Sequence, residues 1–451
     1  MSSGMEFRRL VWEVLCDTSG KFRKDILREK FAKLNIPAFE KRFISEMVHG
    51  ITRRKQTLEH IARQYSKALP KDIWVLNALW MGLYQMLFMQ SVPAYAIIDT
   101  TVELLKERKK HKESGYVNAI LRRVQRESHG VENQKQSDDI LPIDLHRSIQ
   151  FQTKVFPNPE KKLCEYWSIV YSYPLWIVNR WYERWGKEDC QRILEAGNSV
   201  APVFLRVRKN FSEIEKAFTS QGIEFSVQGN FLQLLHPGRI EALPLYQEGY
   251  WTVIGPSAAS FVEAMNPKPG MKILDMCAAP GSKSAYIADL LENSGTIIAV
   301  DISAERIQSL EENKIRLKID CLQPVIMDAS CLPKEYTESF DQVLLDAPCS
   351  NSAVLAKRGE ARWRLNSQNI QELCHLQKKL LLSAARAVKK GGTLVYCTCS
   401  LEPEENQAVI QNFLEENQEF VCEEKKQIFP LPPELDGGSF FKLSRKNQEG
   451  A

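Results

Sequence analysis

Two cysteines follow apolar runs in the last quarter of the chain, in similar surroundings. Residues 346–350 read Asp-Ala-Pro-Cys-Ser after the apolar run 343–345, and residues 397–400 read Cys-Thr-Cys-Ser after the run 394–396. Cys349 and Cys399, 50 positions apart, are thus predicted to emerge at the carboxyl ends of two strands of one sheet. A thiolate is suited to adding to carbon 6 of a pyrimidine, which makes carbon 5 electron-rich enough to attack a sulfonium methyl group. One such cysteine alone is usually a packing residue, but the pair predicts catalysis.

A second run of residues predicts a cofactor pocket. Residues 273–283 form an apolar strand that passes through a turn of small residues into a helix. Small side chains let the backbone approach a ligand, and a helix N-terminus favours a carboxylate. The run lacks the three spaced glycines of a dinucleotide site, so a methionine carboxylate fits better than a pyrophosphate. The predicted cofactor-binding residues here are Cys277, Ala278, Ala279, Pro280, Gly281, Ser282 and Lys283.

Two acidic residues close the next two predicted strands. Asp301 follows the run 297–300, where a carboxylate can accept hydrogen bonds from both ribose hydroxyls, and Asp328 follows the run 325–327, from where it can reach the edge of an adenine. Either residue alone would suit a helix cap equally well. In this order after the small-residue turn, they predict a nucleoside pocket.

The elements that must position these residues belong to an α/β fold. From about residue 257 the pattern alternates, with strands expected at 272–276, 296–300, 324–327, 342–345 and 393–397. Helices are expected between them, notably at 282–291, 304–317 and 370–388. Such alternation predicts a doubly wound, Rossmann-like sheet whose ligands bind beyond the carboxyl ends of the strands.

The rest of the chain predicts two further parts. Apolar residues at helical spacing fill the first 130 residues, and a polar stretch at 131–144 suggests a linker. A small α+β module follows, with helices at 174–196 and 211–221, a strand at 203–207 and a hairpin at 225–235.

Composition narrows the classes of function. The 451 residues are 44% hydrophobic and 26% charged, as in ordinary globular proteins, and no apolar run is long enough to span a bilayer or to act as a signal peptide. We therefore expect a cytoplasmic protein without a membrane partner, with its eleven cysteines reduced. Only Cys397 and Cys399 are close in sequence, so no metal site is expected. Residues 1–130 hold 24 basic against 14 acidic residues, which suggests contact with nucleic acid, or else merely a solvated basic surface.

In their order and spacing, these motifs resemble those of the RNA 5-methylcytosine methyltransferases. The resemblance rests on residues 275–283, 346–350 and 398–400, and it is closest to the Sun/Fmu family, that of the bacterial ribosomal RNA small-subunit methyltransferase B. Residues 116–123 resemble the end of that family's NusB-like helical domain. Residues 394–406 and 436–441 resemble its catalytic C-terminal region.

The resemblance implies a cofactor, a role for each site residue and a division of the chain. Residues 277–283 would wrap the methionine part of S-adenosylmethionine, Asp301 would hold the ribose and Asp328 the adenine. Asp346 would lie between cofactor and target base. Cys399 matches the nucleophile, and Cys349 matches the cysteine that assists product release. The implied partner is 16S ribosomal RNA, before or during small-subunit assembly, with the protein a monomer. The implied parts are a NusB-like domain (1–135), a linker (136–170), a small RNA-binding α+β subdomain (171–256) and a class I methyltransferase domain (257–447).

The chain also departs from the family pattern. Asn351-Ser352-Ala353 stands where the family usually has Gly-Thr-Gly or Ala-Thr-Gly, Ser282 replaces a glycine, and the usual Gln-Asp is missing around Ile254. Residues 356–360 read Ala-Lys-Arg-Gly-Glu before Trp363, where the family usually has two arginines and a Pro-Asp. We expect these departures to lie on an RNA-facing loop, away from the nucleophile and the acidic residues, and to affect the choice of target.

Two other classes of function fit part of the sequence. One is an RNA-binding assembly or antitermination factor with an inert methyltransferase-like half, which would need neither Cys349 nor Cys399. The other is methylation of an amino group, whose enzymes carry an Asn/Asp-Pro-Pro-Tyr loop where this chain has Asp346-Ala347-Pro348-Cys349.

Overall fold

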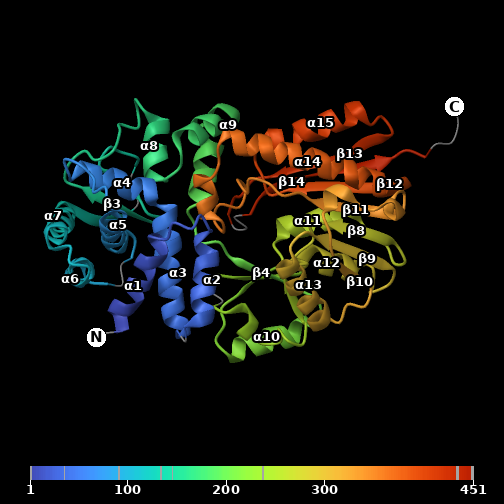
Figure 1. Cartoon of the computed structure of the whole chain (residues 1–451), viewed down its shortest axis with the longest axis horizontal. Coiled ribbons are helices and arrows are strands. Elements are labelled where there is room, and N and C mark those ends of the chain that lie inside the picture. The colour runs from blue at the N-terminus through green and yellow to red at the C-terminus, as the bar shows by residue number, and fades with distance from the viewer. Residues whose placement is uncertain are drawn as a thin grey trace. The chain divides into compact units, whose positions relative to one another are not determined.

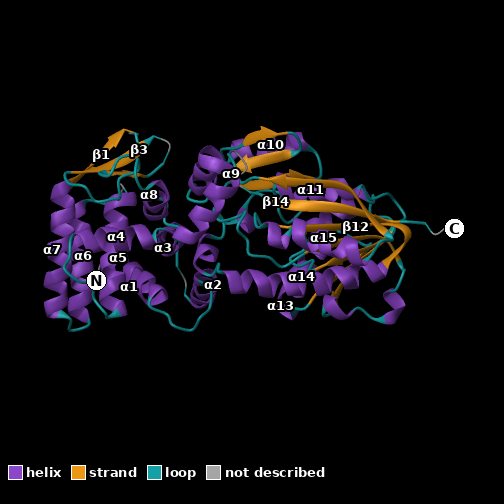
Figure 2. Cartoon of the chain, turned by 90° about the horizontal axis from the view of Figure 1, so that it is seen from above, coloured by secondary structure: helices purple, strands orange, loops and turns teal. Residues whose placement is uncertain are grey.

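The computed structural model describes residues 3–34, 36–89, 92–132, 135–144, 146–235, 238–432 and 436–447. The chain forms two compact units, residues 1–199 and 200–451. Figure 1 shows the course of the chain through each unit, and Figure 2 distinguishes its helices and strands. In the ranges given above, no helix combines the length and the apolarity that crossing a membrane requires.

The first unit begins as a helical bundle, as the spacing of its apolar residues predicts. Its helices are α1 (Ser3–Leu15), α2 (Arg23–Lys33), α3 (Ala38–Arg53), α4 (Lys55–Gln64), α5 (Ile73–Phe88), α6 (Ala94–Glu107) and α7 (His111–Glu127). Helix α5 is buried on nearly all sides because α1, α3, α4, α6 and α7 all pack against it. Its N-terminus is capped by the Asp72 carboxylate, which accepts a hydrogen bond from the Trp74 amide at 2.8 Å.

The stretch that the sequence predicts to be a linker carries regular structure. Three strands form an antiparallel sheet in the order β1, β3, β2, and a helix follows. These are β1 (Ser128–Glu132), β2 (Ile140–Pro142), β3 (Arg147–Phe151) and α8 (Leu163–Val170). The Arg54 guanidinium donates to the Val170 carbonyl at 2.9 Å, so this stretch is attached to the helical bundle. The structure differs from the prediction because the strands are short and their few buried residues, such as Leu141 and Phe151, give no periodic signal.

Helix α9 (Leu175–Ala196) completes the first unit and bends at Gly186, where φ is 74°. The sequence groups this helix with the α+β module, and among the helices and strands of the described residues α9 packs mainly against α8. The Tyr171 hydroxyl donates to Glu195 at 2.7 Å, and the Asn198 side chain donates to the Tyr171 carbonyl at 2.7 Å. These hydrogen bonds fix the end of α9 to the residue that follows α8.

The second unit opens with a small α+β module, as predicted. Its antiparallel sheet has the order β5-β6-β4-β7. The elements are β4 (Val203–Val207), α10 (Phe211–Ser220), β5 (Ser226–Gln228), β6 (Phe231–Leu234), the short helix η1 (Ile240–Ala242) and β7 (Trp251–Val253). Leu205, Phe218 and Trp251 are fully buried between the sheet and α10.

The remainder of this unit is a seven-stranded sheet in the order β10-β9-β8-β11-β12-β14-β13. The first five strands are parallel and the last two antiparallel. The strands are β8 (Lys272–Met276), β9 (Thr296–Asp301), β10 (Leu322–Ile326), β11 (Phe340–Asp346), β12 (Val388–Thr398), β13 (Phe420–Ile428) and β14 (Gly438–Arg445). The helices are α11 (Pro256–Met265), α12 (Ser282–Leu290), α13 (Ala304–Leu317), α14 (Ser367–Ala387) and α15 (Gln407–Glu416), with short helical turns η2 (Ala329–Cys331), η3 (Lys334–Tyr336), η4 (Gly359–Trp363) and η5 (Pro403–Glu405).

Helices cover both faces of this sheet (Figures 1 and 2). Alternate residues of β8 show this: Ile273 packs with α11, α12 and α13, whereas Leu274 packs with α14 and α15. The predicted doubly wound fold is therefore confirmed. The strand order reverses between β8 and β11, and in such sheets the carboxyl ends of the strands leave a ligand crevice at that point.

Candidate active site

The turn between β8 and α12 lies at this reversal point. Cys277 has a φ of 60° and Gly281 a φ of 95°, which glycine adopts without strain. A side chain at position 281 would also collide with Leu310, since an added Cβ would lie 2.8 Å from the Leu310 Cγ. The residues predicted to bind a cofactor therefore form a tight backbone cradle that leads into the N-terminus of α12.

Asp301 ends β9 beside this cradle and is only 2% exposed. Its carboxylate accepts hydrogen bonds from the amides of Ala279 at 3.3 Å and Ser303 at 3.1 Å. The Arg306 guanidinium lies 3.1 Å from Asp301 and also donates to the Ala279 carbonyl. Arg306 was not among the predicted site residues, although its place in the first turn of α13, just after Asp301, is a signal that could have found it.

Asp328 lies at the same edge of the sheet, just after β10. Since β10 pairs with β9 so that Ile326 is opposite Asp301, the two predicted acids occupy adjoining strand ends. The exposed Asp328 carboxylate accepts a hydrogen bond from the Ser330 amide at 2.9 Å, and this bond lowers its pKa. Asp328 is therefore a carboxylate at neutral pH.

Lys283 and Asp346 join the cradle to the end of β11. The Lys283 ammonium lies 2.6 Å from the Asp346 carboxylate. Burial by itself would lower the pKa of Lys283, but the charges of Asp346, Cys397 and Asp275, together with the hydrogen bond to Asp346, outweigh it and raise that pKa above its ordinary value. The other Asp346 oxygen accepts from the Cys397 thiol at 3.6 Å. Asp346 thus lies between the backbone cradle and β12, the strand that precedes Cys399.

Asp275 is a buried acid to which the sequence analysis gave no role. It is inaccessible to solvent on β8 and accepts a hydrogen bond from the Ser284 hydroxyl at 2.6 Å. Burial raises the pKa of Asp275 to about 7, although Ser284 and Lys283 oppose the shift. The candidate site therefore contains a carboxyl group that is partly protonated near neutral pH.

The structure brings the two predicted cysteines together. β11 pairs with β12 so that Asp346 is opposite Cys397, and the loops that follow meet with the sulfur atoms of Cys349 and Cys399 3.0 Å apart. Both are free thiols. The contact with Cys399, followed by burial, raises the pKa of Cys349 well above its ordinary value. The raised pKa keeps the Cys349 thiol protonated, and either sulfur can be the donor in this contact.

A buried carboxylate holds the two cysteine loops against each other. Glu405 accepts hydrogen bonds from the Ser350 amide at 2.8 Å and from the hydroxyls of Ser350 and Ser400. Burial raises the pKa of Glu405, and the hydrogen bonds from the serines oppose the shift. Glu405 was not among the predicted site residues, because its partner Ser350 is 55 positions away in the sequence.

Residues 351–353, where the chain departs from the family pattern, were expected to lie away from Cys399. The structure shows that they lie directly against it. The Ala353 amide donates to the Cys399 carbonyl at 3.1 Å. The Asn351 side chain lies between the cysteines: its NH₂ group donates to the Cys349 carbonyl at 2.8 Å, and its oxygen accepts from the Cys399 thiol at 3.3 Å. The expectation is wrong because the turn after Cys349 folds back over the end of β12.

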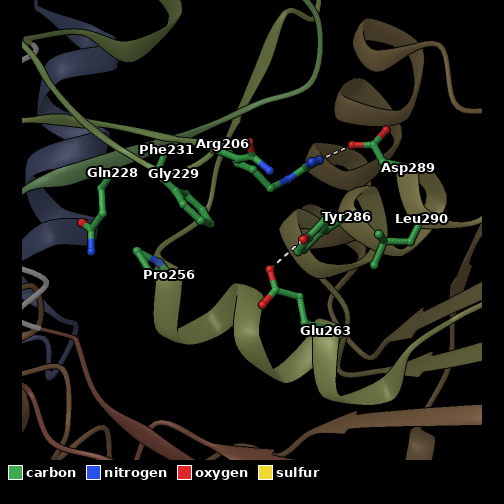
Figure 3. A pocket seen from close by; sticks show the side chains of 10 residues that line it. Arg206, Gln228, Gly229, Phe231, Pro256, Glu263, Tyr286, Asp289 and Leu290 are labelled. Atoms are coloured by element: carbon green, nitrogen blue, oxygen red, sulfur yellow. Dashed lines mark hydrogen bonds and ion pairs between the residues drawn. The ribbon is translucent and has the colours of Figure 1, made fainter. Parts of the chain in front are cut away.

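The second unit also has a cavity of about 530 Å³ on the flank of α12 (Figure 3). Figure 3 shows Arg206 directed towards Asp289, with which it forms an ion pair, and the Tyr286 hydroxyl directed towards Glu263, to which it donates at 2.7 Å. None of the predicted cofactor-binding or catalytic residues lines this cavity. It is therefore distinct from the site at the strand ends.

Three family models match successive parts of the chain. Residues 5–126 match the NusB family, and residues 173–235 match the ferredoxin-like domain of RsmF/B-like methyltransferases. Residues 262–431, which contain both cysteines, match the 16S rRNA methyltransferase RsmB/F model.

Relatives of similar length carry the likeness over most of the chain. A probable ribosomal RNA small subunit methyltransferase B from Synechocystis is 31% identical over 85% of this chain and 83% of its own length. A ribosomal RNA small subunit methyltransferase B from Proteus mirabilis is 31% identical over 90% of both chains. Among solved structures, a methyltransferase homologue from Pyrococcus horikoshii is 26% identical, with a TM-score of 0.54, over 62% of this chain and 97% of its own.

Proposed function

The chain belongs to the family of 16S rRNA methyltransferases RsmB/F, and from this premise we propose that it transfers a methyl group from S-adenosylmethionine to carbon 5 of a specific cytosine in 16S ribosomal RNA. The proposal includes a covalent bond between Cys399 and carbon 6 of that cytosine. The observation that carries it is the 3.0 Å approach of the Cys349 and Cys399 sulfur atoms at the ends of adjacent strands.

The residues at the strand ends fit S-adenosylmethionine. The backbone cradle of residues 277–283 admits close approach of a ligand, and the N-terminus of α12 favours a carboxylate such as that of the methionine part. Asp301 would hold the ribose, and Asp328, ionised and exposed, would reach the adenine. Arg306 must yield part of its contact with Asp301, which its half-exposed side chain allows. When bound, the cofactor supplies a methyl group on a positively charged sulfur.

Cys399 starts the reaction by forming a bond from its sulfur to carbon 6 of the base. The thiol gives up its proton to solvent, a sulfur electron pair forms the new bond, and the electron pair of the C5–C6 double bond moves onto carbon 5 and the ring. Carbon 5 then takes the methyl group, and the electrons of the S–CH₃ bond remain on the cofactor sulfur, which becomes neutral. Asp346, which Lys283 holds at the end of β11, would hydrogen-bond the cytosine ring during this step. The target base must first be unstacked from its neighbours to expose carbon 6.

Release requires the proton on carbon 5 to pass to a solvent base and the Cys399–C6 bond to break. The double bond re-forms, and the Cys399 sulfur departs with the bonding electrons. Cys349 supports this role because its raised pKa keeps a proton on the sulfur adjacent to Cys399. A proton delivered across that 3.0 Å contact would return Cys399 to its thiol form.

The rest of the chain would hold the RNA. The helical part, residues 1–135, carries the excess of basic residues expected of a phosphate-binding surface, and the α+β part, residues 171–256, would contact the neighbouring RNA. Residues 257–447 would carry the catalytic domain. We propose that the protein acts as a monomer in the cytoplasm, on RNA before or during small-subunit assembly.

Bisulfite sequencing tests this function. The purified protein is incubated with S-adenosylmethionine and 16S ribosomal RNA that lacks its modifications, and the RNA is sequenced after bisulfite treatment. We expect one cytosine to become resistant with the wild-type chain and none with Cys399→Ala. Methyl incorporation without a resistant cytosine would overturn the assignment to carbon 5. Equal incorporation by both proteins would overturn covalent catalysis.

A further inference from the structure

We propose that Asn351 is a positioning residue that holds Cys399 as a protonated thiol in the resting protein. Its side chain contacts both cysteine loops, at 2.8 Å from the Cys349 carbonyl and 3.3 Å from the Cys399 sulfur. The inference rests on the proposed role of Cys399 as the nucleophile, because the thiol form cannot attack carbon 6. Asn351 would thus set how readily the nucleophile ionises.

The hydrogen-bond partners fix which way the Asn351 amide is turned. The Cys349 carbonyl can only accept, so the NH₂ group of Asn351 must face it. The amide oxygen then faces the Cys399 sulfur, and that oxygen can also only accept. The contact is therefore a hydrogen bond only while Cys399 carries its proton. Loss of the proton would place a thiolate against oxygen lone pairs.

The Cys349 thiol completes a ring of donors and acceptors. Cys399 donates its one proton to the Asn351 oxygen, and Asn351 donates to the Cys349 carbonyl. The Cys399 sulfur is then left to accept from the Cys349 thiol, 3.0 Å away. Each group thus has its partner while both sulfurs are protonated, and the loss of one proton leaves an acceptor unmatched. Such a closed arrangement stabilises the resting state over the reactive one.

The backbone holds Asn351 in a conformation that few residues adopt. Its φ of 61° lies in the left-handed region, which asparagine and glycine tolerate best. The Val354 amide closes the turn by donating to the Asn351 carbonyl at 3.1 Å. Asn351→Gly can therefore remove the side chain without straining the turn, and Asn351→Asp can keep the shape while adding a charge.

Other ionisable groups surround the Cys399 loop and are the same in every variant. Cys349 faces the sulfur directly, Glu405 lies behind Ser350 and Ser400, and the Asp346–Lys283 pair lies beside Cys397. Differences among Asn, Gly and Asp at position 351 therefore report on that side chain alone.

The test is the rate at which iodoacetamide alkylates Cys399 across a range of pH, measured by peptide mass spectrometry on the full chain. We expect Asn351→Gly to react about fivefold faster at neutral pH, the effect of one lost hydrogen bond, with its half-maximal rate at lower pH. Asn351→Asp should react more slowly, with its half-maximal rate at higher pH. Asn266→Gly is the matched control, since Asn266 is an exposed asparagine elsewhere in the chain with a similar φ of 52°. This substitution should change neither the alkylation rate of Cys399 nor its pH midpoint.

The order of the three rates decides the proposal. A folded Asn351→Gly protein that reacts no faster than the wild type, or an Asn351→Asp protein that reacts faster, overturns it. A faster rate with an unchanged pH midpoint also overturns it, because easier access alone would produce that result. The proposed function fails separately if Cys399→Ala still methylates RNA, whatever the alkylation rates are.

Discussion

The ammonium group of Lys283 lies 2.6 Å from a carboxylate oxygen of Asp346, and this ion pair joins the first turn of α12 to the end of β11. The other Asp346 oxygen accepts from Cys397, two residues before Cys399. The backbone cradle and both cysteine loops are therefore linked through the Asp346 carboxylate. Since Lys283 is charged and largely buried, its charge also acts on Asp275, the protonatable acid on the neighbouring strand.

Asp275→Asn is expected to flatten the pH dependence of stability. Burial raises the folded-state pKa of Asp275 from 3.8 to about 7, so the folded chain binds a proton that the unfolded chain has lost between these values. The stability contributed by Asp275 is therefore full below about pH 4 and is lost as the pH rises through about 7. Between about pH 4 and 8, the free energy of unfolding of the variant, measured with urea, should rise relative to that of the wild type by on the order of a few kcal/mol.

Asp341→Asn serves as the opposite control. Hydrogen bonds from Lys389 and the Lys272 amide lower the pKa of Asp341 despite some burial. Its contribution to stability is present above the ordinary pKa and disappears as the pH falls through the lowered one. This variant should therefore lose stability at neutral pH and match the wild type in acid. Parallel curves for wild type and Asp275→Asn would show that the buried acid does not titrate as described.

Asp301→Ala should weaken the binding of S-adenosylmethionine by about 1.5–3 kcal/mol, the range for hydrogen bonds to a charged group. Isothermal titration calorimetry measures the loss. Because Asp301 also holds the cradle through the Ala279 amide and Arg306, Arg306→Gln is the control, since it removes the ion pair and keeps the carboxylate. Unchanged affinity in a folded Asp301→Ala protein, or an equal loss in Arg306→Gln, would mean that Asp301 does not hold the ribose.

Residues whose role follows from local sequence were predicted well. The bounds of β8 and α13 were predicted to the residue, because an apolar run before a small-residue turn and a helical period are both local signals. Cys349 and Cys399 were predicted to converge because the parallel strands before them were recognised. The contact between their sulfur atoms confirms that convergence.

What the sequence missed depends on distant partners. The importance of Glu405 comes from Ser350, 55 positions away, and that of Asn351 from Cys399, 48 positions away. Strand β13 was not predicted because its exposed residues are mostly charged, and it gains its structure by pairing with β14. Only the folded chain brings such groups together, so a pattern along the sequence could not show them.

Removing positive charge from the helical part should reduce the salt dependence of RNA binding. Lys109 and Lys112 are exposed where α6 gives way to α7. If both contact phosphates, the Lys109→Gln, Lys112→Gln protein should show a slope of log affinity against log salt concentration that is smaller by about 1 to 2. Fluorescence anisotropy with a 16S RNA fragment measures it. The matched control is Lys425→Gln, Lys426→Gln on β13. If the Lys109→Gln, Lys112→Gln protein has the same slope as the wild type, these two lysines do not contact phosphates.

The sharpest prediction separates the two cysteines. Cys399→Ala should form neither product nor a covalent RNA complex, because no sulfur reaches carbon 6. Cys349→Ala should still attack and methylate, but it should fail to release the RNA, since the protonated partner 3.0 Å away is gone. Denaturing electrophoresis should therefore show a protein–RNA complex with Cys349→Ala that requires S-adenosylmethionine.

The double variant and the cysteine Cys397 provide the controls for this experiment. The complex should vanish in the Cys349→Ala, Cys399→Ala protein, because the trapped bond is to Cys399. It should persist in the Cys349→Ala, Cys397→Ala protein, since Cys397 is fully buried and donates to Asp346. If Cys399→Ala trapped RNA and Cys349→Ala turned over normally, the two roles would have to be exchanged. If neither single substitution changed activity, the reaction would not proceed through a cysteine adduct.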